Sequence, residues 1–154
     1  MTENKVEISC SLWEKMFNQV FTSAQIGMAI LDKNGNFVKV NPAFCKLLGY
    51  TNYELANKNW KDITHPEDIL KSANYTDSYT DKPPEYTTVL EKRYITSTGK
   101  TVFCQITTTV INTNENEFFY FVTQIQNLTT VIELRAEIEK IRDFVRRALD
   151  RMAV

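Results

Sequence analysis

Glycine, histidine and long apolar runs are all scarce in this sequence. Only four glycines and one histidine occur among 154 residues. The glycines form no phosphate-binding loop, and the histidine has neither metal-spaced partners nor an evident nucleophile, so the chain is not expected to be an enzyme. No apolar run approaches the length of a bilayer span and no basic-then-apolar leader follows Met1, so we expect no membrane segment.

Strong charge of one sign is absent as well. Eighteen basic and nineteen acidic residues give a formal net charge of −1. A nucleic-acid-binding protein usually carries a basic surface, so we expect no nucleic-acid partner. The three cysteines, Cys10, Cys45 and Cys104, are odd in number and lack Cys-x-x-Cys spacing. They indicate reduced thiols in a cytoplasmic protein.

The arrangement of turn signals and apolar periods predicts an α+β fold. Residues 27–32 and 37–40 flank an Asn-Gly turn and predict a hairpin. Short helices are then expected, one from Asn41-Pro42 to Gly49 and another opened by Thr64, which has capping-box spacing to Glu67. Three β-rich stretches follow, at residues 89–96, 101–112 and 117–126. This order predicts an antiparallel sheet with helices on one face. The expected units are 1–22, an amphipathic helix; 23–127, a globular domain; and 128–154, a last helix.

The last helix carries an apolar residue at alternating steps of three and four, which is typical of a parallel two-stranded coiled coil and predicts a homodimer. Glu137 of one copy would lie near Arg142 of the other. The alternative is an amphipathic helix folded back on its own domain. The predicted seam consists of Val131, Leu134, Ile138, Ile141, Val145, Ala148 and Met152.

Five short motifs in this order resemble the PAS sensor family over residues 23–129. They are Leu31-Asp32-x-x-Gly35, Val40-Asn41-Pro42-Ala43-Phe44, Leu48-Gly49-Tyr50, His65-Pro66-Glu67-Asp68 and Thr98-Gly99-Lys100. The resemblance implies a five-stranded antiparallel sheet in the order 2-1-5-4-3, cupped around a small pocket. It further implies a usually dimeric sensory module upstream of an effector, such as a kinase of a two-component system or a cyclase.

The last strand ends in a variant of a family motif. Members commonly carry Asp-Ile-Thr at this joint, and this chain carries Asn127-Leu128-Thr129. The acid is lost, so a salt bridge at the joint is in doubt, although Asn127 retains hydrogen-bonding capacity. The dimeric helix begins immediately afterwards, where a signal would leave the domain.

The resemblance also allows two cofactors to be considered. The flavin-binding photoreceptor branch requires a reactive cysteine where this chain has Trp60, and a glutamine where it has Ile125. Both losses argue against flavin. The haem branch requires an axial histidine, and His65 is the sole candidate. The competing interpretation is that His65 belongs to a helix-entry turn and bonds to backbone there, so no cofactor is the favoured expectation.

Alternation along the strands predicts the wall of any pocket. This mostly apolar wall suits a small, largely apolar ligand with one hydrogen-bonding end. The alternative is that these side chains fill the core completely, leaving a ligand-free protein-interaction module. The predicted wall consists of Leu31, Leu48, Ile63, Tyr94, Cys104, Ile106, Phe121, Thr123 and Ile125.

The opposite face of the sheet is predicted to expose an apolar patch. Its members are Phe103, Phe118, Tyr120 and Val122. We expect the N-terminal helix to cover this patch in its own subunit or in the partner, as a second dimer contact. The covering residues would be Trp13, Met16, Phe17 and Val20.

Overall fold

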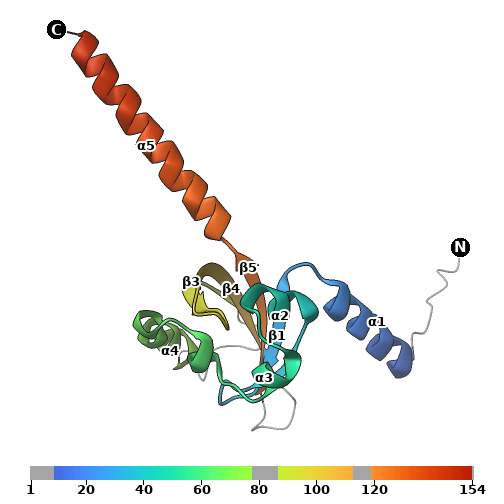
Figure 1. The fold of residues 1–154 in the computed structure, drawn as a ribbon. Coiled ribbons are helices and arrows are strands. Elements are labelled where there is room, and N and C mark those ends of the chain that lie inside the picture. Colours follow the sequence, from blue (N-terminus) through green and yellow to red (C-terminus); the bar gives the residue numbers. More distant parts are fainter. Residues whose placement is uncertain (1–8, 78–86, 113–118, 154) are drawn as a thin grey trace, which may run out of the picture.

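A five-stranded antiparallel sheet forms the centre of the molecule. The computed structural model describes residues 9–77, 87–112 and 119–153. Its strands run in the order β2-β1-β5-β4-β3, which confirms the predicted fold class and strand order (Figure 1). The strand bounds are β1 (Gly27–Leu31), β2 (Phe37–Val40), β3 (Thr87–Ile95), β4 (Thr101–Asn112) and β5 (Phe119–Asn127). Phe118, predicted for the outer face, lies outside the described residues.

Short helices connect β2 to β3 and lie together on one face of the sheet (Figure 1). The predicted helix after Asn41 begins at Pro42 and ends before Gly49, whose φ of 76° is the left-handed conformation that glycine adopts readily. The helical elements are α2 (Pro42–Leu48), α3 (Asn52–Ala56), the 3₁₀ turns η1 (Trp60–Ile63) and η2 (Pro66–Asp68), and α4 (Ile69–Asp77).

The predicted capping box at Thr64 is wrong. Thr64 ends η1 instead, and its hydroxyl donates to the Trp60 carbonyl at 2.7 Å. His65 is the N-cap of η2, and its Nδ1 accepts from the Glu67 amide at 3.2 Å. The cap therefore falls on the residue directly before Pro66, because proline favours the first helical position.

Asn41 fastens three elements together from a fully buried position. Its Oδ1 accepts from the amides of Met28 in β1 and Phe44 in α2, at 2.8 and 3.0 Å. Its Nδ2 donates to the carbonyls of Phe21 and Ile26, at 3.1 and 3.0 Å. The amide group thus uses both its acceptor and its donor capacity, and it joins the end of the N-terminal helix to the sheet and to α2.

The apolar core lies between the sheet and these short helices. Phe44 of α2 approaches Gly27 of β1 so closely that a Cβ at Gly27 would lie 3.2 Å from the ring and 3.3 Å from the Cβ of Ile125. Gly35, in the turn between β1 and β2, allows a similar approach of Trp60. An added Cβ there would meet the indole at 2.4 Å, so this contact requires glycine.

The N-terminal helix α1 (Cys10–Ser23) contacts the domain mainly near its C-terminal end. Phe21 is buried, and Lys39 Nζ of β2 donates to Asn18 Oδ1 at 2.6 Å. The helix extends away from the domain and does not cover the outer face of its own sheet (Figure 1). The residues predicted to cover that face are exposed: Trp13, Met16, Phe17 and Val20. Coverage by a second copy stays a prediction.

The C-terminal helix α5 (Thr129–Met152) leaves the domain as a straight rod (Figure 1). None of its residues is buried, and the large apolar side chains that it exposes range from 41% exposed at Val131 to 80% at Met152. Ile132 and Ala148 are partly covered. The alternative of a helix folded back on its own domain is therefore wrong. No helix in the described part of the chain is long and apolar enough to cross a membrane.

Candidate ligand site

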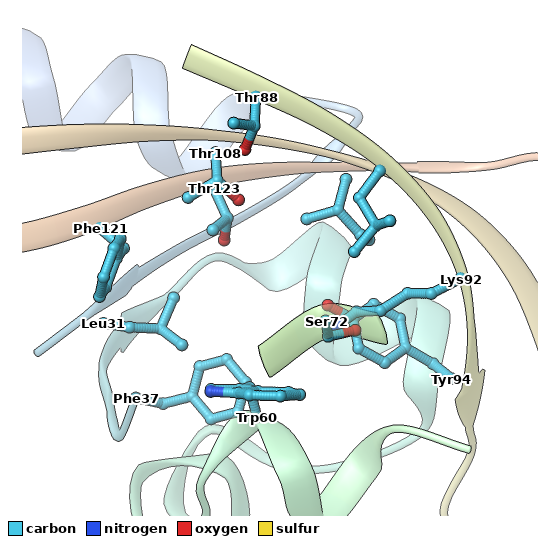
Figure 2. A pocket seen from close by; sticks show the side chains of 12 residues that line it. Leu31, Phe37, Trp60, Ser72, Thr88, Lys92, Tyr94, Thr108, Phe121 and Thr123 are labelled. Carbon is cyan, nitrogen blue, oxygen red and sulfur yellow. The ribbon is translucent and has the colours of Figure 1, made fainter. Parts of the chain in front are cut away.

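A cavity of about 60 Å³ lies between the inner face of the sheet and the helical layer (Figure 2). One part of its wall is apolar, and another carries hydroxyl groups and one ammonium group. The alternative of a core without internal space therefore does not describe this chain. The wall consists of Leu31, Phe37, Trp60, Ser72, Thr88, Leu90, Lys92, Tyr94, Ile106, Thr108, Phe121 and Thr123.

Only some of the predicted wall residues line this cavity. Those that do are Leu31, Tyr94, Ile106, Phe121 and Thr123. The others are buried outside this wall, and at the Gly27 end of the sheet α2 fills the space, as the close approach of Phe44 to Gly27 shows. The residues displaced from the predicted wall are Leu48, Ile63, Cys104 and Ile125.

The prediction missed most of the polar wall. Thr88, Leu90 and Lys92 alternate with the outward residues of β3 in the same phase as Tyr94, and Thr108 follows Ile106 in β4. If the alternation of inward and outward residues had been extended along β3 from Tyr94 and along β4 from Ile106, it would have predicted these four wall residues. The remaining missed residues, Phe37, Trp60 and Ser72, lie on β2 and on the helical layer, and their places depend on how the layers pack.

Lys92 is the unusual member of this wall. Its side chain enters the buried space beside Tyr94 (Figure 2), with only 8% of its surface exposed. Nζ donates to Thr64 Oγ1 at 3.3 Å and lies over the rings of Trp60 and Tyr94, 4.6 and 4.8 Å from their centroids. Desolvation by burial lowers the pKa of Lys92 to about 7, against the opposing attraction of Asp68.

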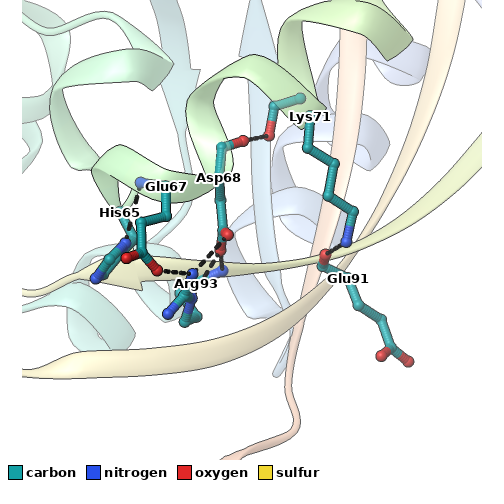
Figure 3. Close-up of polar contacts among 7 residues, drawn as sticks. His65, Glu67, Asp68, Lys71, Glu91 and Arg93 are labelled. Atoms are coloured by element: carbon teal, nitrogen blue, oxygen red, sulfur yellow. Dashed lines mark hydrogen bonds and ion pairs between the residues drawn. The ribbon is translucent and has the colours of Figure 1, made fainter.

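A second polar group, outside the cavity, ties the helical layer to β3 (Figure 3). Arg93 donates to Asp68 at 3.0 Å through Nε, at 2.8 Å through Nη2 and at 2.8 Å through its backbone amide. Glu67 accepts from the same Nη2 at 3.0 Å. Both acids of the His65-Pro66-Glu67-Asp68 motif are therefore partners of Arg93. The hydrogen bonds from Arg93 lower the pKa of Asp68 to about 2.

Replacing Asp68 with asparagine should therefore remove a pH-dependent part of the stability. The folded-state pKa is about 2 against an ordinary 3.8, so the stabilisation is fully present above pH 3.8 and disappears as the pH falls through 2. We expect Asp68→Asn to lower the free energy of unfolding by about 2 kcal/mol at neutral pH. Urea unfolding at several pH values measures it. An equal loss at neutral and at acidic pH would contradict the assignment.

The described residues do not fit a haem or a flavin. The Nδ1 of His65 is engaged by the Glu67 amide, and His65 is not part of the cavity wall. The Trp60 indole occupies the wall where the photoreceptor branch needs a thiol, and Ile125 lies in the packed core. A cavity of about 60 Å³ is also far smaller than the several hundred cubic ångströms typical of cofactor sites. Among the described residues, no cluster of three metal-ligating side chains occurs.

The joint between β5 and α5 is built from backbone and two side chains. The Leu128 amide donates to the Phe103 carbonyl at 2.7 Å, and the Phe103 amide donates to Thr129 Oγ1 at 3.1 Å. Asn127 Oδ1 accepts from the Thr129 amide at 2.9 Å, so Asn127 does form a hydrogen bond at the position of the lost acid. The root of α5 is therefore attached to β4.

Comparison with known proteins identifies the same architecture. A family model described as a PAS domain matches residues 25–130. A probable diguanylate cyclase, DgcE of Escherichia coli (strain K12), is 27% identical over 115 residues. The match covers 75% of this chain and 10% of that protein, so the chain spans about one tenth of the length of this relative.

Solved structures share the fold at low sequence identity. A PAS domain from a two-component sensor histidine kinase is 19% identical, with a TM-score of 0.57 over 77% of this chain and 99% of that one. A PAS domain from Colwellia psychrerythraea is 14% identical, with a TM-score of 0.69 over 77% and 98%. An RNA-binding light-oxygen-voltage receptor is 14% identical, with a TM-score of 0.74 over 93% and 41%. The family model, the strand order and the shared fold together show that this chain belongs to the PAS domain family, the sensory domains of signalling proteins.

Proposed function

We propose that this PAS domain is a homodimeric sensory module that passes a change in its core through a pair of α5 helices to an effector domain. The module is regulatory and performs no catalysis itself. The observation that carries the proposal is the apolar stripe of α5: none of its residues is buried by the described part of the chain, and its large side chains are exposed from Val131 to Met152.

The composition of α5 supports pairing with a second copy. A helix that exposes an apolar seam in water needs a partner, and the seam repeats every seven residues. Phe144 and Leu149, which were not part of the predicted seam, flank it in the second half of the helix and are 73% and 60% exposed. They widen the apolar surface there, so a two-helix contact would bury more area near the C-terminal end.

The charged residues of α5 are compatible with this arrangement. In the single chain Glu137 lies 3.8 Å from Lys140, and Arg142 lies 3.0 Å from Glu139. Both ion pairs are exposed and contribute little to stability. Exchanging them for ion pairs between two helices would therefore cost little free energy. The ion pairs within one helix therefore do not oppose the proposed contact of Glu137 with Arg142 of the second copy.

The related diguanylate cyclase and the histidine-kinase PAS domain support an effector of cyclase or kinase type. A ligand can pass a signal to such an effector only if it binds the module more tightly in one arrangement of the helix pair than in another. The attachment of α5 to β4 offers the route, since β4 contributes Ile106 and Thr108 to the cavity wall and also holds the root of the helix through Phe103.

Charged substitutions in the seam test the dimer. Ile138→Asp combined with Ile141→Asp should convert a dimer into monomers, because pairing would bury four carboxylates in the apolar seam. Sedimentation equilibrium measures the mass, and the folded domain should keep its thermal transition.

The matched control places two carboxylates on the opposite face of the same helix, by Ala136→Asp with Lys140→Asp. This variant should remain dimeric. A wild-type chain that is monomeric at high concentration, or a seam variant that stays dimeric, would refute α5 pairing as the main contact.

A further inference from the structure

The cavity wall contains the ammonium group of Lys92, and no carboxylate accompanies it among the described lining residues. Lys92 is the only charged residue in the cavity wall, and within the described part of the chain no carboxylate lies within salt-bridge distance of its Nζ. The one hydrogen-bond acceptor it contacts is Thr64 Oγ1, and the two aromatic rings offer only their faces. An ammonium group has three donors, so two of them have no acceptor among the described residues.

The neighbours of Lys92 do not supply the missing charge. Asp68 is held by three hydrogen bonds from Arg93. Burial raises the pKa of the Cys104 thiol to about 12, and it raises the pKa of Tyr94 as well, so both groups are neutral at physiological pH. Ser72 on α4 and Thr64 on η1 contribute hydroxyl groups without charge. Among the described residues the ammonium group therefore has no ion-pair partner, and only the more distant charge of Asp68 acts on it.

The rest of the wall restricts what could supply the charge. Leu31, Phe37 and Phe121 lie across the cavity from Lys92 and make that end apolar (Figure 2). Among the described residues no acid lines the cavity, which disfavours amino acids because their ammonium group would have no partner. The described wall also contains no second cation, which disfavours dicarboxylates. A volume of about 60 Å³ corresponds to roughly four to six water-sized positions, which limits the occupant to a few heavy atoms.

We propose that this cavity binds a short-chain monocarboxylate, with its carboxylate on Lys92 Nζ and its alkyl group against Leu31, Phe37 and Phe121. The inference deepens the proposed function by naming the class of signal. The threonine hydroxyls of Thr88, Thr108 and Thr123 lie along the wall between these two ends (Figure 2) and suit the boundary between the charged and apolar parts of such a molecule.

Calorimetric titration with sodium acetate, propionate and butyrate, in a buffer free of carboxylates, tests the proposal. We expect one member of the series to bind, and its uncharged amide and its amine of equal length not to bind. Lys92→Met keeps most of the length of the side chain and removes its charge, so it should weaken carboxylate binding about tenfold or more. Lys71→Met is the matched control, because Lys71 is exposed and donates only to the Glu91 carbonyl at 2.9 Å. It should bind as the wild type does.

Binding should also weaken as the pH rises above 7. The free ammonium loses its proton near pH 7, and an anion requires the protonated form. Each further pH unit should therefore raise the dissociation constant about tenfold until the bound form titrates. Equal binding of carboxylate and amide, binding that survives Lys92→Met, or no binding by any member of the series would overturn the proposal.

Two results separate this inference from the proposed function. If no carboxylate binds and the seam substitutions in α5 still give monomers, the dimeric module stands and the ligand class is wrong. If propionate binds through Lys92 while the wild-type chain is monomeric, the ligand site stands and the proposed relay is wrong.

Discussion

Replacing Asn41 with alanine is expected to lower the free energy of unfolding by at least about 4 kcal/mol. The substitution leaves four backbone groups without their partner: the amides of Met28 and Phe44 and the carbonyls of Phe21 and Ile26. Each buried group that loses its hydrogen bond costs about 1–3 kcal/mol. Since a domain of this size has a total stability of about 5–15 kcal/mol, the variant should be partly unfolded at physiological temperature.

Urea denaturation monitored by tryptophan fluorescence measures this loss. Asn57→Ala is the matched control, because Asn57 ends α3 and makes a single exposed hydrogen bond to the Tyr53 carbonyl at 2.9 Å. It should cost less than about 1 kcal/mol. Asn41→Asp keeps both acceptor contacts but loses both donors, so it should also be strongly destabilised. A loss at Asn41 no greater than at Asn57 would show that the network contributes little.

Lys92→Met should have the opposite effect and stabilise the unliganded domain, by about 2–4 kcal/mol near pH 6. The folded-state pKa of Lys92 is about 7 and the ordinary value is 10.5, so the unfolded chain binds more protons between these values. Stability of the wild type therefore rises with pH across this window, and the penalty of burying the ammonium is largest at and below pH 7. Methionine has no such penalty at any pH.

The difference between Lys92→Met and the wild type should thus narrow steadily from pH 7 towards pH 10. Urea unfolding at each pH, in the absence of carboxylate buffers, gives the two curves. Lys71→Met, which removes an exposed ammonium, should show no comparable trend. A constant difference across the pH range would mean that folding does not lower the pKa of Lys92, which would contradict the assignment of a buried, uncompensated ammonium group.

Much of the fold was predictable because local signals agreed with the global arrangement. The Asn-Gly turn, the cap at Asn41 and the alternation along the last three strands each specified an element, and the strand order followed from the family resemblance. The one local error, at Thr64, arose because the chain makes two successive 3₁₀ turns. Capping-box spacing does not distinguish the end of one turn from the start of the next.

The site was less predictable than the fold. Alternation placed Tyr94 and Ile106 correctly, but a lysine in phase with them was not considered for an apolar wall, since buried lysines are rare. Leu48 and Ile125 were assigned to the wall because they are apolar and face inward. Whether an inward residue lines a cavity or fills the core depends on how closely α2 packs, and Gly27 allows Phe44 to close that end. Such packing is a property of several elements together.

The attachment of α5 to β4 has a mechanical consequence. A helix of 24 residues is about 36 Å long, and within the described part of the chain its hydrogen bonds to the domain lie at its first turn, on Phe103 and Asn127. A rotation of about 5° at that hinge would therefore displace Met152 by about 3 Å, by the geometry of a lever of this length. A small rotation at the joint is thus converted into a much larger displacement at the far end of the helix, where the proposed partner helix would follow it.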